Sequence, residues 1–187
     1  MHISAKKKYA DSIMEKVVEG MKKALSFWQM MGFIATGIGG TLLHFLYDWT
    51  GHNPVVGAFS AVNESIWEHM KLLFFPMLTF SFIAYTVLGK NYPNFWCVKL
   101  IGTLFGLGVI PVLYYTYTGA LGISVDWFNI AIFFIAAAAV YWLETKLLQK
   151  DRPRCQYPTL SLGILLLIGI IFIMLTYFPP NLPLFQD

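Results

Sequence analysis

Residues 160–178 read LSLGILLLIGIIFIMLTYF and contain no charged side chain. A helix needs about 20 mostly apolar residues to cross the hydrocarbon core of a bilayer, so this stretch predicts a membrane-spanning helix. The rest of the chain is similar, since 57% of its 187 residues are hydrophobic and 12% are charged. A soluble domain has roughly 25% charged residues. The composition excludes a disordered chain and indicates an integral membrane protein.

Four more stretches have the length and composition of a membrane helix. The five predicted spans are residues 27–47, 72–88, 96–117, 127–148 and 160–178. The second helix could begin as early as residue 63. We therefore predict an all-α, polytopic integral membrane protein in which residues 27–178 form a domain of five transmembrane helices, and residues 179–187 form a short tail.

The segment 48–62 is longer than the other predicted connections and is partly apolar. Irregular backbone at membrane depth is tolerated only where protein covers it or where it lines water. Three arrangements therefore stay open for this segment. It dips back into the bilayer as a re-entrant loop, lies along the membrane surface, or packs on the helices.

The distribution of Lys and Arg predicts the orientation of the chain. Of the 13 Lys and Arg residues, all except Lys71 fall on one side of the five predicted spans. Short cytoplasmic segments of membrane proteins are enriched in Lys and Arg. We therefore predict a cytoplasmic N-terminus and a C-terminus outside. The bilayer is the expected partner, and nucleic acid is not, because the net charge is only +3 and most of the chain is apolar.

Residues 1–26 form a cytoplasmic arm with an amphipathic pattern. Its apolar residues recur every four positions, at Tyr9, Ile13, Val17, Met21 and Leu25. This spacing places them near one face of a helix, with lysines beside them. Two interpretations stay open: a helix lying in the inner membrane interface, or a helix packed on the protein's own cytoplasmic loops.

Two further pairs of residues lie near the cytoplasmic ends of the predicted helices. Cys97 and Cys155 both fall on that side, and because the cytoplasm is reducing we expect free thiols and no disulfide. Lys99 and Glu144 should lie at similar depth in neighbouring helices. We expect them to form a structural ion pair.

The predicted outer side holds an unusual concentration of polar groups between residues 44 and 69. Ionisable groups at membrane depth are costly, and together they favour a functional site there. The main candidates for ligand or metal binding are His44, Asp48, Glu64, Glu68 and His69. Weaker candidates are His52, Asn63 and Trp67. Taken singly, each has a structural alternative, such as a helix start, an interfacial aromatic residue or a hydrogen-bonded polar group.

The spacing of these residues suggests how they could act together. Asn63 is a suitable N-cap for the second helix, which places Glu64 in its first turn. Glu64 and Glu68 then share a helix face and repel each other, unless Lys71, a shared proton or a cation offsets their charges. Carboxylates and imidazoles together suit Zn, Mn or Fe, so a divalent metal is a candidate cofactor. The zinc motif His-Glu-x-x-His is absent.

The run Asn63-Glu-Ser-Ile-Trp-Glu-His-Met-Lys71 resembles the signature N-E-S-x-W-E-H-x-K of an uncharacterised family of small multi-pass bacterial membrane proteins. The upstream helix end His44-Phe-Leu-Tyr47 and the C-terminal Pro179-Pro-x-x-Pro-Leu-Phe185 are similar too. The resemblance implies about five helices and the cytoplasmic membrane of a bacterium. It implies no activity, because the family has none assigned.

Three functions are compatible with this pattern. The first is a membrane protein whose outward-facing Glu/His pocket binds a cation or a small polar ligand. The second is an intramembrane metal-dependent hydrolase of lipid or peptide, in which a metal-bound water is the nucleophile. The third is a non-catalytic subunit whose motif binds another membrane protein. Both enzymatic and non-enzymatic functions therefore stay open.

Overall fold

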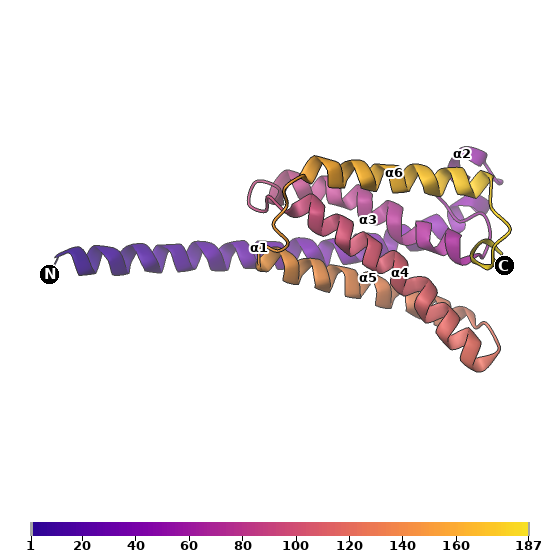
Figure 1. The fold of residues 1–187 in the computed structure, drawn as a ribbon, viewed down its shortest axis with the longest axis horizontal. Helices are drawn as coiled ribbons and strands as arrows, with labels where there is room; N and C mark the ends of the chain where they lie inside the picture. The colour runs from indigo at the N-terminus through magenta and orange to yellow at the C-terminus, as the bar shows by residue number, and fades with distance from the viewer. Residues whose placement is uncertain (1, 187) are drawn as a thin grey trace.

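A computed structural model describes residues 2–186 of the chain, and the side chains from residue 11 to residue 186 (Figure 1). Its elements are α1 (His2–Trp49), α2 (Pro54–Gly57), α3 (Ile66–Leu88), α4 (Phe95–Leu121), α5 (Asp126–Gln149), α6 (Pro158–Tyr177) and the 3₁₀ turn η1 (Pro183–Phe185). The described residues contain no strand, so the prediction of an all-α fold is confirmed.

Five of these helices are long and apolar enough to cross a membrane, as predicted. They are α3, α4, α5, α6 and the part of α1 from Asp11 to Trp49. The long helices run alternately up and down the bundle (Figure 1). One end of the bundle therefore holds the end of α1, the starts of α3 and α5, and the ends of α4 and α6. We call it the loop 48–62 end, and the opposite end the cysteine end.

Helix α1 continues far beyond the bundle. It runs without a break through 48 residues, so the predicted N-terminal arm and the first span form one helix. At about 1.5 Å per residue such a helix is roughly 70 Å long, more than twice the hydrocarbon thickness of a bilayer. Figure 1 shows its N-terminal part extending alone from the cysteine end. Met21 and Leu25 lie against the bundle, whereas Ile13 and Val17 are exposed.

Small residues let the helices of the bundle approach closely. A Cβ atom on Gly40 of α1 would lie 2.8 Å from the carbonyl oxygen of Leu72 in α3. A Cβ atom on Gly106 of α4 would lie 2.6 Å from the side chain of Val140 in α5. Ala136 and Ala137 of α5 are fully buried. Close packing of this kind replaces the hydrophobic driving force that helices lack inside lipid.

The segment 48–62 packs on the ends of the helices. The backbone N–H of Tyr47 donates to Ser60 Oγ over 3.1 Å, and the hydroxyl of Ser60 donates to the carbonyl of Leu43. The hydroxyl of Tyr177 at the end of α6 donates to the carbonyl of Pro54. Of the three arrangements open from the sequence, packing on the helices is therefore observed.

The cysteine end contains the buried pair of Lys99 and Glu144. The ammonium Nζ of Lys99 lies 2.6 Å from Oε2 of Glu144, and Gln29 Nε2 donates to the same oxygen over 3.4 Å. Both members of the pair are almost fully buried. The pair joins α4 to α5 and, through Gln29, to α1.

The expectation that Cys97 and Cys155 carry free thiols is wrong for this structure, in which they form a disulfide. The loop between α5 and α6 folds back over the first turn of α4, which brings the two Cα atoms to 5.9 Å. This separation lies within the range of about 4.4–6.8 Å that a disulfide requires. The expectation relied on the redox state of a compartment, whereas proximity in the fold is set by the path of the loop.

Candidate metal site

Three residues from different segments meet at the loop 48–62 end of the bundle. His44 lies in the last turns of α1, Glu64 lies in the loop that precedes α3, and His69 lies in the first turns of α3. Oε2 of Glu64 is 3.5 Å from Nε2 of His44 and 3.5 Å from Nε2 of His69. One ligand atom from each of the three residues lies within 4.8 Å of the others. Three of the five main candidates predicted from the sequence are therefore adjacent.

The imidazole of His69 is held in one orientation by its own helix. Its Nδ1 lies 2.9 Å from the carbonyl oxygen of Ser65. A carbonyl can only accept a hydrogen bond, so Nδ1 carries the proton and Nε2 of the neutral ring has a free lone pair. That Nε2 is the atom directed at Glu64. Histidines that bind metals are usually oriented in this way, by a hydrogen bond from the other ring nitrogen to a carbonyl or carboxylate.

The spacing of the three ligand atoms is close to that around a small cation. In a tetrahedral zinc site with bonds of about 2.1 Å, neighbouring ligand atoms lie about 3.4 Å apart. The two distances of 3.5 Å from Glu64 match this value. The rings of His44 and His69 have centroids 5.5 Å apart and are inclined to each other at an interplanar angle of 64°.

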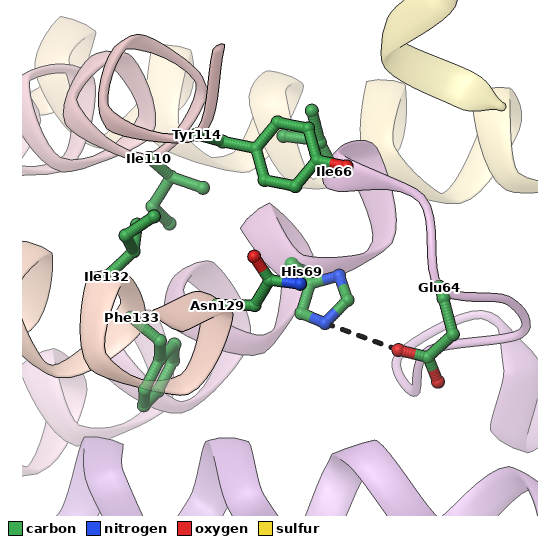
Figure 2. A pocket seen from close by; sticks show the side chains of 8 residues that line it. All are labelled: Glu64, Ile66, His69, Ile110, Tyr114, Asn129, Ile132 and Phe133. Carbon is green, nitrogen blue, oxygen red and sulfur yellow. Dashed lines mark ion pairs between the residues drawn. The ribbon is translucent and has the colours of Figure 1, made fainter. Parts of the chain in front are cut away.

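A small pocket extends from this group into the bundle (Figure 2). Its polar residues come from the loop before α3 and from α3, α4 and α5, and apolar residues lie beside them. It is lined by Glu64, Ile66, His69, Ile110, Tyr114, Asn129, Ile132 and Phe133. Its free space is about 20 Å³. This is about the volume that one water molecule needs, so the pocket suits an ion or a water better than a large organic ligand.

Two other predicted candidates pair with each other at the surface. His52 Nε2 lies 3.1 Å from Oδ1 of Asp48, and both side chains are about 70% exposed, at 68% and 73%. Neither belongs to the group formed by His44, Glu64 and His69. Exposed pairs of this kind contribute little to stability.

Asn63 and Trp67 make contacts that stabilise the fold at this end of the bundle. Oδ1 of Asn63 accepts from the hydroxyl of Ser65 over 2.7 Å and from its backbone N–H over 3.2 Å. The indole ring of Trp67 packs between Phe172 and Phe185, with centroid distances of 4.5 and 4.7 Å. These contacts fix the loop before α3 and the C-terminal turn η1.

Glu68 lies in a separate buried network with Lys71. Its Oε2 is 2.6 Å from Nζ of Lys71, and the Lys71 ammonium also donates to the carbonyl of Gly57 over 2.9 Å. The hydroxyl of Thr176 accepts from Lys71 over 2.8 Å and donates to Oε1 of Glu68 over 3.0 Å. The backbone N–H of Val62 donates to Oε2 of Glu68 over 3.1 Å. This network ties α3 to α6 and to the 48–62 segment.

The prediction that Glu64 and Glu68 share a helix face is wrong. The N-cap is Ser65, whose Oγ accepts from the backbone N–H of Glu68, and not Asn63. Helix α3 therefore begins at Ile66, and Glu64 precedes it. The two carboxylates therefore contact different partners, and the expected repulsion between them on one helix face does not arise.

Sequence reasoning missed the residues that α4 and α5 add to the pocket. Tyr114 and Asn129 line it together with His69, and the hydroxyl of Tyr117 donates to Oδ1 of Asn129. No signal in the sequence links them to the 44–69 segment, because their position depends on how α4 and α5 pack. Ser65, by contrast, could have been identified from the sequence, because it lies inside the nine-residue motif.

The fold and the site define a multi-pass membrane protein with five spanning helices and a His/Glu group at one end. The chain belongs to the family described as "Family of unknown function (DUF6512)", whose model matches residues 17–187. The expected membership of an uncharacterised family is therefore confirmed.

Two curated proteins are distantly similar to the chain. Both are named heme A synthase, from Ehrlichia ruminantium strains Gardel and Welgevonden, and each is 25% identical over 173 residues. The match covers 88% of this chain and 50% of each relative, so the chain spans about half the length of these proteins. No solved structure matches the chain.

Proposed function

We propose that this protein binds a divalent transition-metal cation at the group formed by His44, Glu64 and His69. The observation that carries the proposal is the orientation of His69. Its Nδ1 donates to the carbonyl of Ser65, and its Nε2 faces Glu64 Oε2 at 3.5 Å. Two imidazoles and one carboxylate are a ligand set typical of zinc, and they also suit iron and manganese.

The distribution of Lys and Arg indicates which side of the membrane the site faces. All Lys and Arg residues except Lys71 belong to segments at the cysteine end of the bundle or to the N-terminal part of α1. Cytoplasmic segments of membrane proteins carry such an excess of Lys and Arg. We therefore infer that the cysteine end faces the cytoplasm of a bacterium, and that the metal group faces outwards.

Haem is a second cofactor to consider, because the relatives are named for haem A. The residues of the site do not fit it. The carboxylate of Glu64 lies between the two imidazoles, at 3.5 Å from each, where a flat macrocycle would have to pass. The pocket beside them has free space of about 20 Å³, sufficient for a water molecule and far too small for a porphyrin. The site therefore supports a bare ion and no haem.

Hydrolysis is a second candidate function, favoured by the number of ligands. Catalytic zinc sites have three protein ligands and an open position for water, whereas structural sites have four. Here three ligands adjoin a water-sized pocket lined by Tyr114 and Asn129. A metal-bound water in that pocket would be the nucleophile, and Tyr114 and Asn129, which line the pocket, would be positioned to hydrogen-bond to that water. Turnover of a panel of lipids and peptides by the metal-loaded protein tests this second function.

Elemental analysis of the purified full-length protein tests metal binding. We expect about one zinc, iron or manganese per chain after loading and desalting, and loss of this metal in Glu64→Gln and in His69→Ala. The matched control is His52→Ala, which removes an imidazole at the same end of the molecule and should keep the metal. Equal metal content in wild type and Glu64→Gln would contradict the proposal. Absence of metal together with loss of assembly in Glu64→Gln would instead favour the partner-subunit function.

A further inference from the structure

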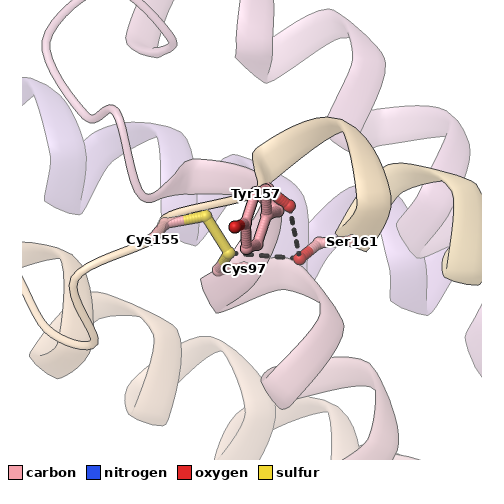
Figure 3. The surroundings of a disulfide bond; sticks show 4 residues. All are labelled: Cys97, Cys155, Tyr157 and Ser161. Carbon is pink, nitrogen blue, oxygen red and sulfur yellow. Dashed lines mark hydrogen bonds between the residues drawn. A yellow bond between two sulfur atoms is a disulfide. The ribbon is translucent and has the colours of Figure 1, made fainter.

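The disulfide between Cys97 and Cys155 lies at the end of the bundle opposite the metal group. Figure 3 shows it joining the first turn of α4 to the loop between α5 and α6. Both cysteines are partly exposed. The bond is therefore within reach of a reactant in the adjoining aqueous compartment.

This disulfide includes a residue of a positively charged loop. The loop that contains Cys155 also contains Lys150, Arg152 and Arg154, all exposed. With the orientation proposed above, this loop faces the cytoplasm. Thiols in that compartment are kept reduced, and cytoplasmic disulfides are usually transient and catalytic or redox-sensing.

The two sulfur atoms have different surroundings. Cys97 is the third residue of α4, so its sulfur lies at the positive end of a helix of 27 residues. The hydroxyl of Ser161 in α6 lies 3.1 Å from Sγ of Cys97. The alternative acceptor for this hydroxyl, the carbonyl of Tyr157, is farther away at 3.5 Å. A helix N-terminus and a hydroxyl donor both stabilise a thiolate, and reactive cysteines occur in such positive, partly exposed environments.

We propose that Cys97 and Cys155 are a redox-active pair that exchanges two electrons with a cytoplasmic dithiol, with Cys97 as the thiolate that leaves and attacks. This proposal rests on the inferred orientation and is independent of metal binding. Ser161 is the positioning residue, because it acts through the sulfur of Cys97. The charged groups around the pair are the loop residues Lys150, Asp151, Arg152 and Arg154, together with Lys99 of α4, which is neutralised by Glu144.

Reduction then proceeds in two balanced steps. A thiolate of the dithiol attacks Sγ of Cys155, a new S–S bond forms, and the bond to Cys97 breaks. Cys97 leaves as a thiolate at the start of α4 and takes up a proton. The second thiol of the dithiol then loses its proton and attacks the dithiol's first sulfur, which is bonded to Cys155. Cys155 is released as a thiolate and is protonated in turn. The dithiol ends as a disulfide, the protein gains two thiols, and the reverse sequence oxidises them.

Thiol trapping in inverted membrane vesicles tests the pair in the full-length, folded protein. Vesicles are treated with mixtures of reduced and oxidised dithiothreitol, quenched in acid and labelled with a maleimide polymer that shifts the protein on a gel. We expect reversible reduction and reoxidation without denaturant. A bond that resists reduction until the protein is denatured would overturn the proposal.

The role of Ser161 is tested with the single-thiol variant Cys155→Ser. The rate of Cys97 alkylation is measured against pH, with and without Ser161→Ala. We expect Ser161→Ala to slow the reaction at neutral pH by about 3- to 10-fold and to shift its profile to higher pH, since a charge-assisted hydrogen bond to the thiolate is lost. The control is Ser81→Ala, a buried serine whose hydroxyl donates within α3 to the carbonyl of Met77. An unchanged profile in Ser161→Ala would contradict the proposed asymmetry.

Discussion

Glu64 and Glu68 are four residues apart in the sequence, and their surroundings are opposite. The side chain of Glu68 is 3% exposed, and both of its oxygens have partners from Lys71, Thr176 and Val62. The side chain of Glu64 is 69% exposed and faces two imidazole nitrogens at 3.5 Å, with the pocket beside it. A carboxylate whose hydrogen bonds are complete stabilises the fold, whereas an exposed carboxylate beside two imidazole nitrogens is available to a cation.

The largest expected effect, on stability, comes from removing one member of the buried Glu68–Lys71 pair. Glu68→Gln leaves the ammonium of Lys71 buried without its counter-charge, which typically costs about 3–5 kcal/mol. We expect a large drop in the thermal unfolding midpoint of the protein in detergent. The double variant Glu68→Leu, Lys71→Met removes both charges and should recover most of the loss. An unfolding midpoint equal to that of wild type in Glu68→Gln would show that the pair is not structural.

Glu64→Gln should have the opposite pair of effects: a large loss of metal affinity and little change in stability. The metal affinity should fall by more than about 100-fold, because even residues that only support a metal ligand typically contribute 10- to 100-fold. The stability of the metal-free protein should change by less than about 0.5 kcal/mol, since the side chain is exposed. Isothermal titration with zinc and a thermal scan of the metal-free protein measure the two quantities. A destabilised variant with unchanged metal affinity would reverse the roles assigned to the two glutamates.

A lower pH should weaken metal binding. Protons compete with the metal for the free Nε2 atoms of His44 and His69, so binding releases protons and the affinity falls as the pH falls. Zinc titrations at several pH values in buffers of different ionisation enthalpy measure the number of protons released. An affinity that does not depend on pH would exclude imidazole ligands.

The smallest expected effect is at the exposed pair of Asp48 and His52. Asp48→Asn should change the free energy of unfolding by less than about 0.5 kcal/mol, because exposed ion pairs contribute little. Metal affinity should stay within twofold of wild type. A clear loss of metal in this variant would extend the site to the end of α1.

The sequence predicted the bundle well because hydropathy and helix length are local properties. Five long apolar helices were expected and are present, and Lys99 lies 2.6 Å from Glu144. The start of α3 was misplaced, because a choice between Asn63 and Ser65 as N-cap depends on a few hydrogen bonds. The separation of Glu64 from Glu68 follows from that start, so it was missed as well.

The site was predicted only as far as its own segment reaches. The 44–69 window contains His44, Glu64 and His69, which the fold brings together, so their concentration in the sequence was sufficient to predict that they lie close to one another. Tyr114 and Asn129 arrive from α4 and α5 by packing, which no spacing reports. The disulfide was missed for the same reason, since it depends on the path of the loop between α5 and α6.

The X-ray absorption spectrum of the zinc-loaded, full-length protein tests the central claim most directly. We predict two imidazole nitrogens and at least one oxygen at about 2.0–2.2 Å in the wild type, and the same ligands in His52→Ala. Sulfur ligands at about 2.3 Å would place the metal at Cys97 and Cys155 instead and contradict the account. A protein that retains no zinc after desalting would contradict it as well.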